Sequence, residues 1–311
     1  MSAARLEWVA ADPASEHMLK IAAKVAGTST TVLITGESGT GKDHLARWIH
    51  EAGPRRDAPF LKIDCASLPS ELVESELFGH ERGAFTGAEA RKRGRLELAR
   101  EGTIVLDEVA ALAPGAQSKL LRVIEERKFE RLGGTETLEM DSRLIALTNA
   151  DLERAVRGGH FREDLLFRLN VLVIIVPPLR ERPRDIRPLV EYFLARLAPV
   201  HGRSGAKIDP AAMNALEGYS WPGNVRELKN VIEHALIFAP GETLKREDFP
   251  ANLDVGAETA ATMKLQSLEE MEKEAVRATL EATHYKIAQA AEILGISRKT
   301  LLEKRKKYGL V

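Results

Sequence analysis

The first 180 residues contain short runs of consecutive apolar residues, each followed within two residues by a glycine, a carboxylate, an amide or a proline. Runs without apolar–polar alternation are typical of strands buried on both faces of a parallel sheet. They predict strands at residues 32–34, 104–106, 144–147 and 171–176, the last a core strand stopped by Pro177 and Pro178. A helical pattern at residues 43–51 follows the first run. The chain is therefore predicted to have an α/β fold with a parallel central sheet.

The C-terminal segment has the pattern of short helices. Ser267 to Glu270 has the spacing of a capping box, and the helical pattern after it runs to about Ala282. A second short helix is predicted at residues 286–294, and Ser297 is predicted to cap a last helix that runs to about Tyr308. This is a helix-turn-helix pattern. Residues 251–264, which have few large apolar residues and no aromatic ones, are predicted to be a flexible linker.

A glycine-rich segment after the first predicted strand fits G-x-x-x-x-G-K. Its glycines let successive backbone N–H groups turn inward, and the positive end of the following helix faces the anion that they bind. Nucleotide binding is predicted for Gly36, Glu37, Ser38, Gly39, Thr40, Gly41, Lys42 and Asp43. Asp43 stands where a Ser or Thr usually helps to hold Mg²⁺. That hydroxyl must come from elsewhere, with Thr40 the nearest candidate, or be replaced by water.

Asp107 and Glu108 end the second predicted strand. A phosphate-loop enzyme places at this point a Mg²⁺ carboxylate and then a carboxylate that polarises water. Asp107 is therefore predicted to hold Mg²⁺, and Glu108 to deprotonate the attacking water as the general base. An isolated Asp-Glu pair is commonly just a solvated strand end. Beside the Lys42 loop, the two motifs together indicate nucleotide hydrolysis.

The segment from Glu74 to Ala88 reads ESELFGHERGAFTGA. Gly83, Phe85 and Thr86 belong to a hexapeptide too glycine-rich to hold a helix, yet one that displays an aromatic ring beside a hydroxyl. Taken alone, it is equally well an ordinary surface loop. Its interpretation depends on the motifs around it.

Together these motifs resemble one family, the AAA+ bacterial enhancer-binding proteins, which use ATP to activate RNA polymerase carrying the sigma-54 factor. The resemblance spans most of the chain and is carried in order by GESGTGKD, FLKIDCASLP, ESELFGHERGAFTGA, GTIVLDEV, RLIALTNADLE, FREDLLFRLNVLVIIVPPLRERPRDI and WPGNVRELKNVIEHA. GAFTGA is the family's hallmark. The resemblance implies an AAA+ phosphate-loop NTPase that binds ATP with Mg²⁺. It also implies that Gly83, Phe85, Thr86 and Gly87 lie on a loop that rises from the ATPase surface, contacts sigma-54 and moves with the nucleotide state.

The resemblance also implies a shared active site. Arg162 and Arg168 resemble arginine fingers, which stabilise charge on the transferring phosphoryl group when a neighbouring subunit delivers them. Outside this motif they would be ordinary exposed basic residues. A shared site implies a ring of identical subunits, and the family suggests a hexamer. Arg226 resembles the sensor that reports the γ-phosphate from the lid, and Thr148 and Asn149 end a strand near the same site.

Two positions depart from the family's pattern. Position 43 is commonly Glu, so Asp43 keeps the carboxylate but shortens it. Position 64 is usually an Asn said to hold the Walker B glutamate until the activator engages its target. Asp64 stands there instead, and a second carboxylate near Glu108 would repel its charge where an amide could donate a hydrogen bond. The hold on the Walker B glutamate, and its release when the activator engages its target, are therefore expected to work differently in this chain.

The last predicted helix is strongly basic. It offers Arg298, Lys299, Lys304, Arg305, Lys306 and Lys307 against one acid, Glu303. Such local charge suits the phosphate backbone of DNA, although it also fits a solvated helix face. The segment AAEILGISRKTLLEKRKKYGL resembles the Fis-type DNA-binding domain of many enhancer-binding proteins. The resemblance predicts DNA contacts from Ser297, Arg298, Lys299, Thr300, Lys304 and Arg305.

Composition sets limits on these interpretations. A chain of 311 residues with 44% hydrophobic content can bury more than one core, and a net charge of −1 means that acidic surface elsewhere balances the basic tail. The single cysteine, Cys65, is expected to be a buried structural thiol. The eight histidines show no ligand spacing, so no metal site beyond Mg²⁺ with nucleotide is expected. The N-terminus is too charged for a signal peptide, so a cytoplasmic protein without a membrane span is expected.

We divide the chain into an α/β ATPase part (residues 1–177), a helical lid (178–249), a linker (250–265) and a small all-α helix-turn-helix domain (266–311). Only about thirty residues precede Gly36, so control is expected from a separate regulatory protein, from expression level or from the promoter. The predicted function is an ATP-hydrolysing activator that binds upstream promoter DNA and remodels sigma-54 RNA polymerase. The alternatives are a DNA-binding repressor that uses nucleotide only for assembly and an AAA+ remodeller of a non-transcriptional target.

Overall fold

The computed structural model describes residues 8–250, 253, 276, 277, 279, 280, 283, 286–294 and 296–308. The chain divides into two compact units, residues 1–254 and 255–311. None of the helices in the described part of the chain combines the length and the apolar character that a membrane span requires.

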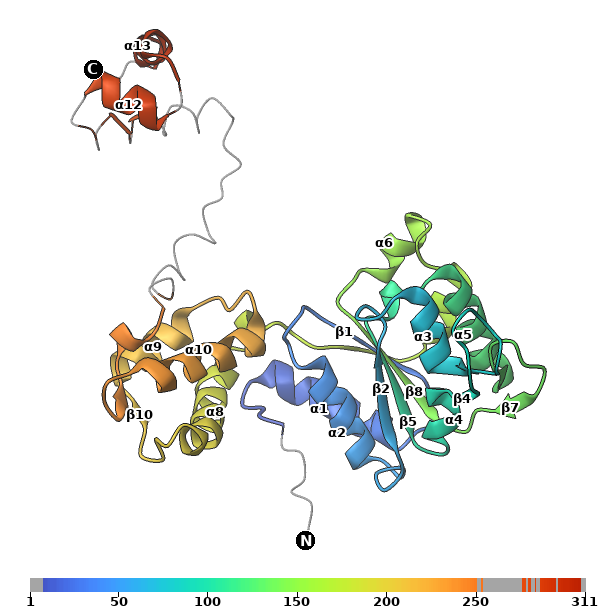
Figure 1. Ribbon diagram of the computed structural model, residues 1–311. Helices are drawn as coiled ribbons and strands as arrows, with labels where there is room; N and C mark the ends of the chain where they lie inside the picture. Colours follow the sequence, from blue (N-terminus) through green and yellow to red (C-terminus); the bar gives the residue numbers. More distant parts are fainter. Residues whose placement is uncertain are drawn as a thin grey trace. The chain divides into compact units, whose positions relative to one another are not determined.

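A five-stranded parallel sheet lies at the centre of the first unit, with strand order β2-β5-β8-β1-β9 (Figure 1). Its strands are β1 (Val32–Thr35), β2 (Phe60–Asp64), β5 (Thr103–Asp107), β8 (Arg143–Thr148) and β9 (Val173–Ile175). The predicted parallel sheet is confirmed, as are the predicted strands at residues 32–34, 104–106 and 144–147.

Helices cover both faces of this sheet (Figure 1). One face packs against α1 (Pro13–Ala26) and α2 (Lys42–Ala52), and α2 contains the helix predicted at residues 43–51. The other face packs against α3 (Ser70–Phe78), α4 (Arg95–Ala99), α5 (Pro114–Glu126), α6 (Leu152–Arg157) and α7 (Glu163–Leu169). In β1, Val32 and Ile34 join the first layer and Leu33 joins the second. The run is unbroken because both faces are buried.

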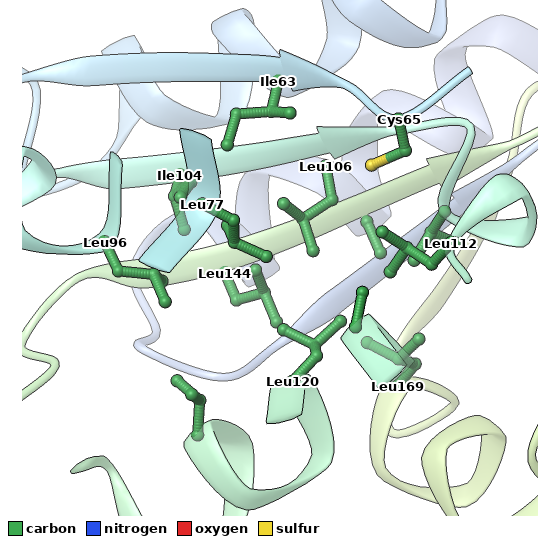
Figure 2. Close-up of a cluster of buried hydrophobic side chains, with 14 of the residues drawn as sticks. Ile63, Cys65, Leu77, Leu96, Ile104, Leu106, Leu112, Leu120, Leu144 and Leu169 are labelled. Carbon is green, nitrogen blue, oxygen red and sulfur yellow. The ribbon is translucent and has the colours of Figure 1, made fainter. Parts of the chain in front are cut away.

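The core of the second layer is drawn in Figure 2, where leucine and isoleucine side chains from the sheet meet those of the covering helices. Leu106 and Leu144 come from β5 and β8, and Leu77 and Leu120 come from α3 and α5. Cys65, directly after β2, lies in the same core, and burial raises the pKa of its thiol to about 12. The prediction of a buried thiol is confirmed.

The last strand of the sheet differs from its prediction. Residues 171–176 were expected to form a core strand, but β9 is an edge strand in which Ile174 is buried while Val173 and Ile175 are 40% and 68% exposed. An unbroken apolar run does not reveal whether a second layer covers the strand. Here α1 packs on one side and the other side is open to solvent.

The lid follows β9 and has a core of its own. It consists of α8 (Ile186–Val200), α9 (Pro210–Gly218), α10 (Asn224–Phe238) and the two-residue strands β10 (Lys207–Ile208) and β11 (Thr243–Leu244). Trp221 is fully buried in this core, and its indole N–H donates to the Leu216 carbonyl at 2.9 Å. The lid is also fixed to the N-terminal segment, because the buried Asp185 carboxylate accepts from the backbone N–H groups of Ala11 and Asp12.

Two short hairpins project from the second layer. β3 (Gly79–His80) pairs antiparallel with β4 (Lys92–Arg93), and β6 (Lys128–Glu130) pairs antiparallel with β7 (Thr137–Glu139). Residues 81–91, which include the GAFTGA hexapeptide, connect β3 to β4.

The second unit contains α12 (Ile287–Ile293) and α13 (Arg298–Lys307), and the helices predicted at residues 286–294 and 298–308 are confirmed. Ser297 caps α13 by accepting from the Thr300 N–H at 3.1 Å, as predicted. Leu301 of α13 packs in a small core with Val276, Leu280, Ala290 and Ala291. Residues 276, 277, 279 and 280 are helical. The predicted capping box and nearly all of the predicted linker lie outside the described residues.

Candidate functional site

The phosphate loop connects β1 to α2 in a conformation that its glycines permit. Gly39 and Gly41 have φ of +78° and +103°, a region that side chains disfavour. A Cβ atom on Gly39 would lie 2.4 Å from the Gly223 carbonyl oxygen of the lid, so the loop and the lid approach more closely than other residues allow. Lys42 Nζ donates to the carbonyl oxygens of Gly36 at 2.8 Å and Glu37 at 3.1 Å. Burial lowers the pKa of Lys42, although the negative charges of Glu108 and Asp107 act to raise it.

Asp107 and Glu108 lie at the end of β5, beside the start of α2. Together with Lys42 and Asp43 they line a cavity of about 350 Å³, to which the lid contributes Arg226. Glu108 has φ +51°, which is uncommon for a residue other than glycine, and its Oε2 accepts from the Asn149 N–H at 3.2 Å. The structure thus brings the predicted phosphate-loop lysine and both predicted carboxylates into one site.

Lys62 of β2 joins the two aspartates of this cavity, a contact that sequence reasoning missed. Its Nζ is 2.5 Å from Asp43 Oδ1 and 2.7 Å from Asp107 Oδ2. Burial tends to lower the pKa of Lys62, but hydrogen bonds to Asp107 and Asp43 outweigh it, and the pKa is raised. Asp64, two residues further along β2, binds the loop that follows the strand: its Oδ1 accepts from the N–H groups of Ala66 at 3.0 Å and Ser67 at 3.2 Å.

Arg226 and Asn224, at the start of α10, connect the lid to the outer side of the phosphate loop. Arg226 donates to Ser38 Oγ at 2.8 Å, and Asn224 Nδ2 donates to Glu37 Oε2 and to the Ser38 carbonyl, both at 3.1 Å. Arg180 forms a two-point ion pair with Glu37, at 2.5 and 2.8 Å. Hydrogen bonds from Arg180 and then Asn224 lower the pKa of Glu37 to about 2.

A second contact to the loop comes from Arg182, which is 1% exposed and donates to the Thr40 carbonyl at 2.7 Å. Sequence reasoning singled out Arg226 but missed the other lid residues at the loop, because their contacts join segments far apart along the chain.

An apolar cavity of about 190 Å³ adjoins the phosphate loop. Trp8 and Val9 line it from the N-terminal segment, and Tyr192 and Phe193 line it from the lid. The Trp8 ring lies 5.2 Å from that of His44 on α2. Sequence reasoning missed these residues because apolar side chains distant along the chain form no motif.

Arg162 and Arg168 lie away from this cavity, on the surface at α7. Arg162 pairs with Asp164 at 2.7 Å, and Arg168 pairs with Glu125 of α5 at 2.8 Å. Their side chains are 46% and 59% exposed, and neither contributes to the lining of the cavity that contains Lys42 and Asp107.

The GAFTGA hexapeptide forms a tight loop at the tip of the β3–β4 connection. The Gly83 N–H donates to the Ala88 carbonyl at 2.8 Å. The Phe85 ring is 39% exposed and lies 5.0 Å, edge to face, from the ring of His80. Thr86 and Gly87 are exposed. Gly83 and Gly87 have φ of +82° and +102°, which explains why both positions are glycine.

Comparison with protein-family models places three successive domains on this chain. A sigma-54 interaction domain matches residues 8–175, an AAA+ ATPase lid domain matches residues 180–266, and a bacterial regulatory protein domain of the Fis family matches residues 267–308. The chain belongs to the sigma-54-dependent transcriptional activators. As a member of this family it has an AAA+ nucleotide-binding module and a helix-turn-helix of the DNA-binding Fis type.

Relatives align with this activator over nearly its whole length. It is 45% identical to the regulatory protein AtoC of Escherichia coli strain K12 over 307 residues, which cover 96% of this chain and 67% of AtoC. It is 44% identical to the transcriptional regulatory protein ZraR of Salmonella typhimurium, with 97% of this chain and 69% of ZraR covered. The crystal structure of NtrX from Brucella abortus in complex with ATP matches with a TM-score of 0.74 at 37% identity, covering 98% of this chain and 69% of NtrX.

Proposed function

We propose that this protein binds and hydrolyses ATP and uses the energy to remodel the closed complex of sigma-54 RNA polymerase at a promoter. The observation that carries the proposal is the convergence of Lys42, Asp107 and Glu108 in one cavity that the lid completes with Arg226. A phosphate-binding cation, a metal-binding carboxylate and a general base are the groups that nucleotide hydrolysis requires.

ATP is proposed to lie across the phosphate loop. Its phosphates would be bound by the N–H groups of residues 36–42 and by Lys42, and the apolar cavity lined by Trp8 and Phe193 would take the adenine base. The crystal structure of NtrX in complex with ATP supports ATP as the nucleotide.

The site fits Mg²⁺ bound together with nucleotide. Asp107 and Asp43 supply carboxylate oxygens in the cavity beside Lys42. In the described part of the chain there is no cluster of three or more His, Cys, Asp or Glu side chains that could hold a metal alone. This matches Mg²⁺, which is usually held by one or two carboxylates plus phosphates and water. When bound, it would neutralise the phosphate charge, and Asp107 is proposed as its protein ligand.

Glu108 is proposed to orient the attacking water and accept its proton. Its Oε2 is held by the Asn149 N–H, which fixes the carboxylate at the cavity and leaves its other oxygen for water. Arg226 is proposed to sense the γ-phosphate, because its contact with Ser38 joins the lid to the loop that holds the phosphates.

The arginine fingers are proposed to act on the site of a neighbouring subunit in a ring, with a hexamer as the suggested assembly. Arg162 and Arg168 do not line the cavity of their own subunit, so delivery to a second copy accounts for their exposure. The exposed apolar side chains of Phe167, Val171 and Ile175 flank Arg168 along the chain. Burying them against a second copy would support that assembly.

Phe85 and Thr86, at the exposed tip of the β3–β4 connection, are proposed to contact sigma-54. The basic helix α13 and its N-cap are proposed to contact upstream DNA through Ser297, Arg298, Lys299, Thr300, Lys304 and Arg305. For the whole chain, we propose the ATPase, lid, linker and DNA-binding divisions at residues 1–177, 178–249, 250–265 and 266–311.

The proposal is tested by measuring phosphate release from ATP by the full chain and by an Asp107→Ala variant. The unaltered chain should release phosphate roughly a hundredfold or more faster than Asp107→Ala, because the variant lacks a group that stabilises transition-state charge. Equal and negligible release by both proteins would refute hydrolysis. It would favour the DNA-binding repressor that uses nucleotide only for assembly.

A further inference from the structure

Lys62 occupies a position that the phosphate-loop and carboxylate motifs do not explain. It lies on β2, and its ammonium group reaches the edge of the sheet at which α2 begins and β5 ends. There it binds Asp43 Oδ1 at 2.5 Å and Asp107 Oδ2 at 2.7 Å. One ammonium group therefore joins the helix after the phosphate loop to the strand that carries the proposed Mg²⁺ ligand.

The neighbouring carboxylates of Asp43 and Asp107 need a positive charge beside them. Because both bind the same nitrogen atom, their oxygens are close neighbours, and two like charges so near each other repel. Lys42 lines the same cavity but donates to the carbonyl oxygens of Gly36 and Glu37. Lys62 is thus the cation that directly balances the aspartate pair among the described residues.

The same contact places Lys62 in competition with a metal ion. Asp107 Oδ1 accepts from the Glu108 N–H at 3.1 Å, and Oδ2 is the oxygen bound to Lys62. A divalent cation on Asp107 would share this carboxylate with the ammonium group, and the two positive charges would repel. Tight Mg²⁺ binding therefore requires the ammonium group to withdraw from Oδ2. The Lys62 side chain is flexible, so its ammonium group can leave Asp107 and stay bound to Asp43.

We propose that Lys62 is a displaceable internal cation, which neutralises Asp43 and Asp107 before Mg²⁺ arrives and releases Asp107 when the metal binds with nucleotide. Lys62 is a positioning residue, and this role rests on the proposed nucleotide site. It sets the Mg²⁺ concentration at which the site fills and keeps the aspartates in place beforehand.

The variant Lys62→Met tests this role because it keeps an unbranched side chain, one atom shorter, and removes the charge. Mg²⁺ should bind the ADP-loaded full chain about tenfold more tightly in this variant, since a hydrogen bond to a charged group is worth roughly that factor or more. The chain without nucleotide should unfold at a lower temperature, because the two carboxylates lose their shared cation. Lys62→Arg keeps the charge and should restore both properties toward those of the unaltered protein.

The measurement is calorimetric titration of the full chain with ADP, first in excess EDTA and then at increasing Mg²⁺. Lys128→Met, which removes an exposed lysine on β6, is the matched control and should leave the Mg²⁺ dependence unchanged. A Mg²⁺ midpoint in Lys62→Met equal to or higher than that of the unaltered chain overturns the inference. A contact of merely structural value would lower the unfolding temperature and leave this midpoint in place.

Two further outcomes are separable. If the unaltered chain binds no ADP in EDTA or with Mg²⁺, the nucleotide site itself is refuted, and the inference falls with it. If ADP binds in both conditions with the same Mg²⁺ dependence in every variant, only the role of Lys62 is refuted. Should Lys62→Met fail to fold, Lys62→Gln is neutral and polar and provides the same comparison.

Discussion

Asn224 offers a direct test of how the lid is held on the phosphate loop. It is fully buried at the start of α10, with φ +54°. Its Oδ1 accepts from the Leu179 N–H at 2.8 Å, while its Nδ2 donates to Glu37 Oε2 and to the Ser38 carbonyl. Asn224→Ala removes these three hydrogen bonds, together with a longer one from Nδ2 to the Pro222 carbonyl at 3.5 Å, and keeps a Cβ atom at a left-handed backbone position.

The cost can be worked from these contacts. A buried hydrogen bond contributes about 1 kcal/mol net, so the three together contribute about 3 kcal/mol. Alanine in the left-handed region adds about 1 kcal/mol, because asparagine tolerates this conformation better than alanine does. We therefore expect Asn224→Ala to lower the free energy of unfolding by about 4 kcal/mol. Asn224→Gly loses the same hydrogen bonds without the steric penalty and should be about 1 kcal/mol less destabilising than Asn224→Ala.

Urea unfolding followed by tryptophan fluorescence is the assay. All three tryptophans of the chain, Trp8, Trp48 and Trp221, lie within residues 1–254, so the signal reports the first unit alone. ADP affinity should fall in both variants, because, of the lid residues that the structure describes, only Arg180 and Arg226 then hold Glu37 and Ser38. If Asn224→Ala unfolds at the same urea concentration as the unaltered chain and binds ADP equally well, the reasoning about these contacts is wrong.

Three further predictions concern single side chains. The pKa of Glu37 is lowered from 4.5 to about 2, so its bonds to Arg180 and Asn224 stabilise the fold above pH 4.5, and this contribution disappears as the pH falls toward 2. The difference in urea midpoint between the unaltered chain and Glu37→Gln should therefore shrink across that range, and a constant difference would contradict the assignment. Burial keeps the pKa of Cys65 near 12, so the native chain should resist alkylation by iodoacetamide at pH 8 and react only when unfolded in urea; rapid labelling of native protein would disprove this. Thr86→Ala should abolish open-complex formation at a sigma-54 promoter in a purified transcription assay while ATP affinity stays unchanged, because Thr86 is exposed at the loop tip; activation that survives the change would exclude this loop from the mechanism.

Local patterns were sufficient for the elements that carry the chemistry. Strands buried on both faces must be apolar at every position, so β1, β5 and β8 could be recognised from residue type alone. The same pattern gave the wrong burial for residues 171–176, because the edge position of β9 depends on the order of strands in the sheet. The expected repulsion between Asp64 and Glu108 also depended on contacts that the sequence does not show. In the structure, the Asp64 carboxylate accepts from the N–H groups of its own loop.

Local sequence patterns are enough to recognise the groups that this protein is proposed to offer to nucleotide, polymerase and DNA. Glycine spacing dictates the phosphate loop, a carboxylate pair ends β5, and basic residues cluster on α13, because each depends on neighbours within a few residues. The way in which distant segments complete the site becomes visible once the chain is folded. Trp8 and Phe193 line one cavity, Arg182 donates to the Thr40 carbonyl, and Lys62 joins Asp43 to Asp107, although all of these residues are far apart along the chain. These arrangements arise because the lid packs against the loop and β2 pairs with β5, and local patterns along the sequence do not encode such packing.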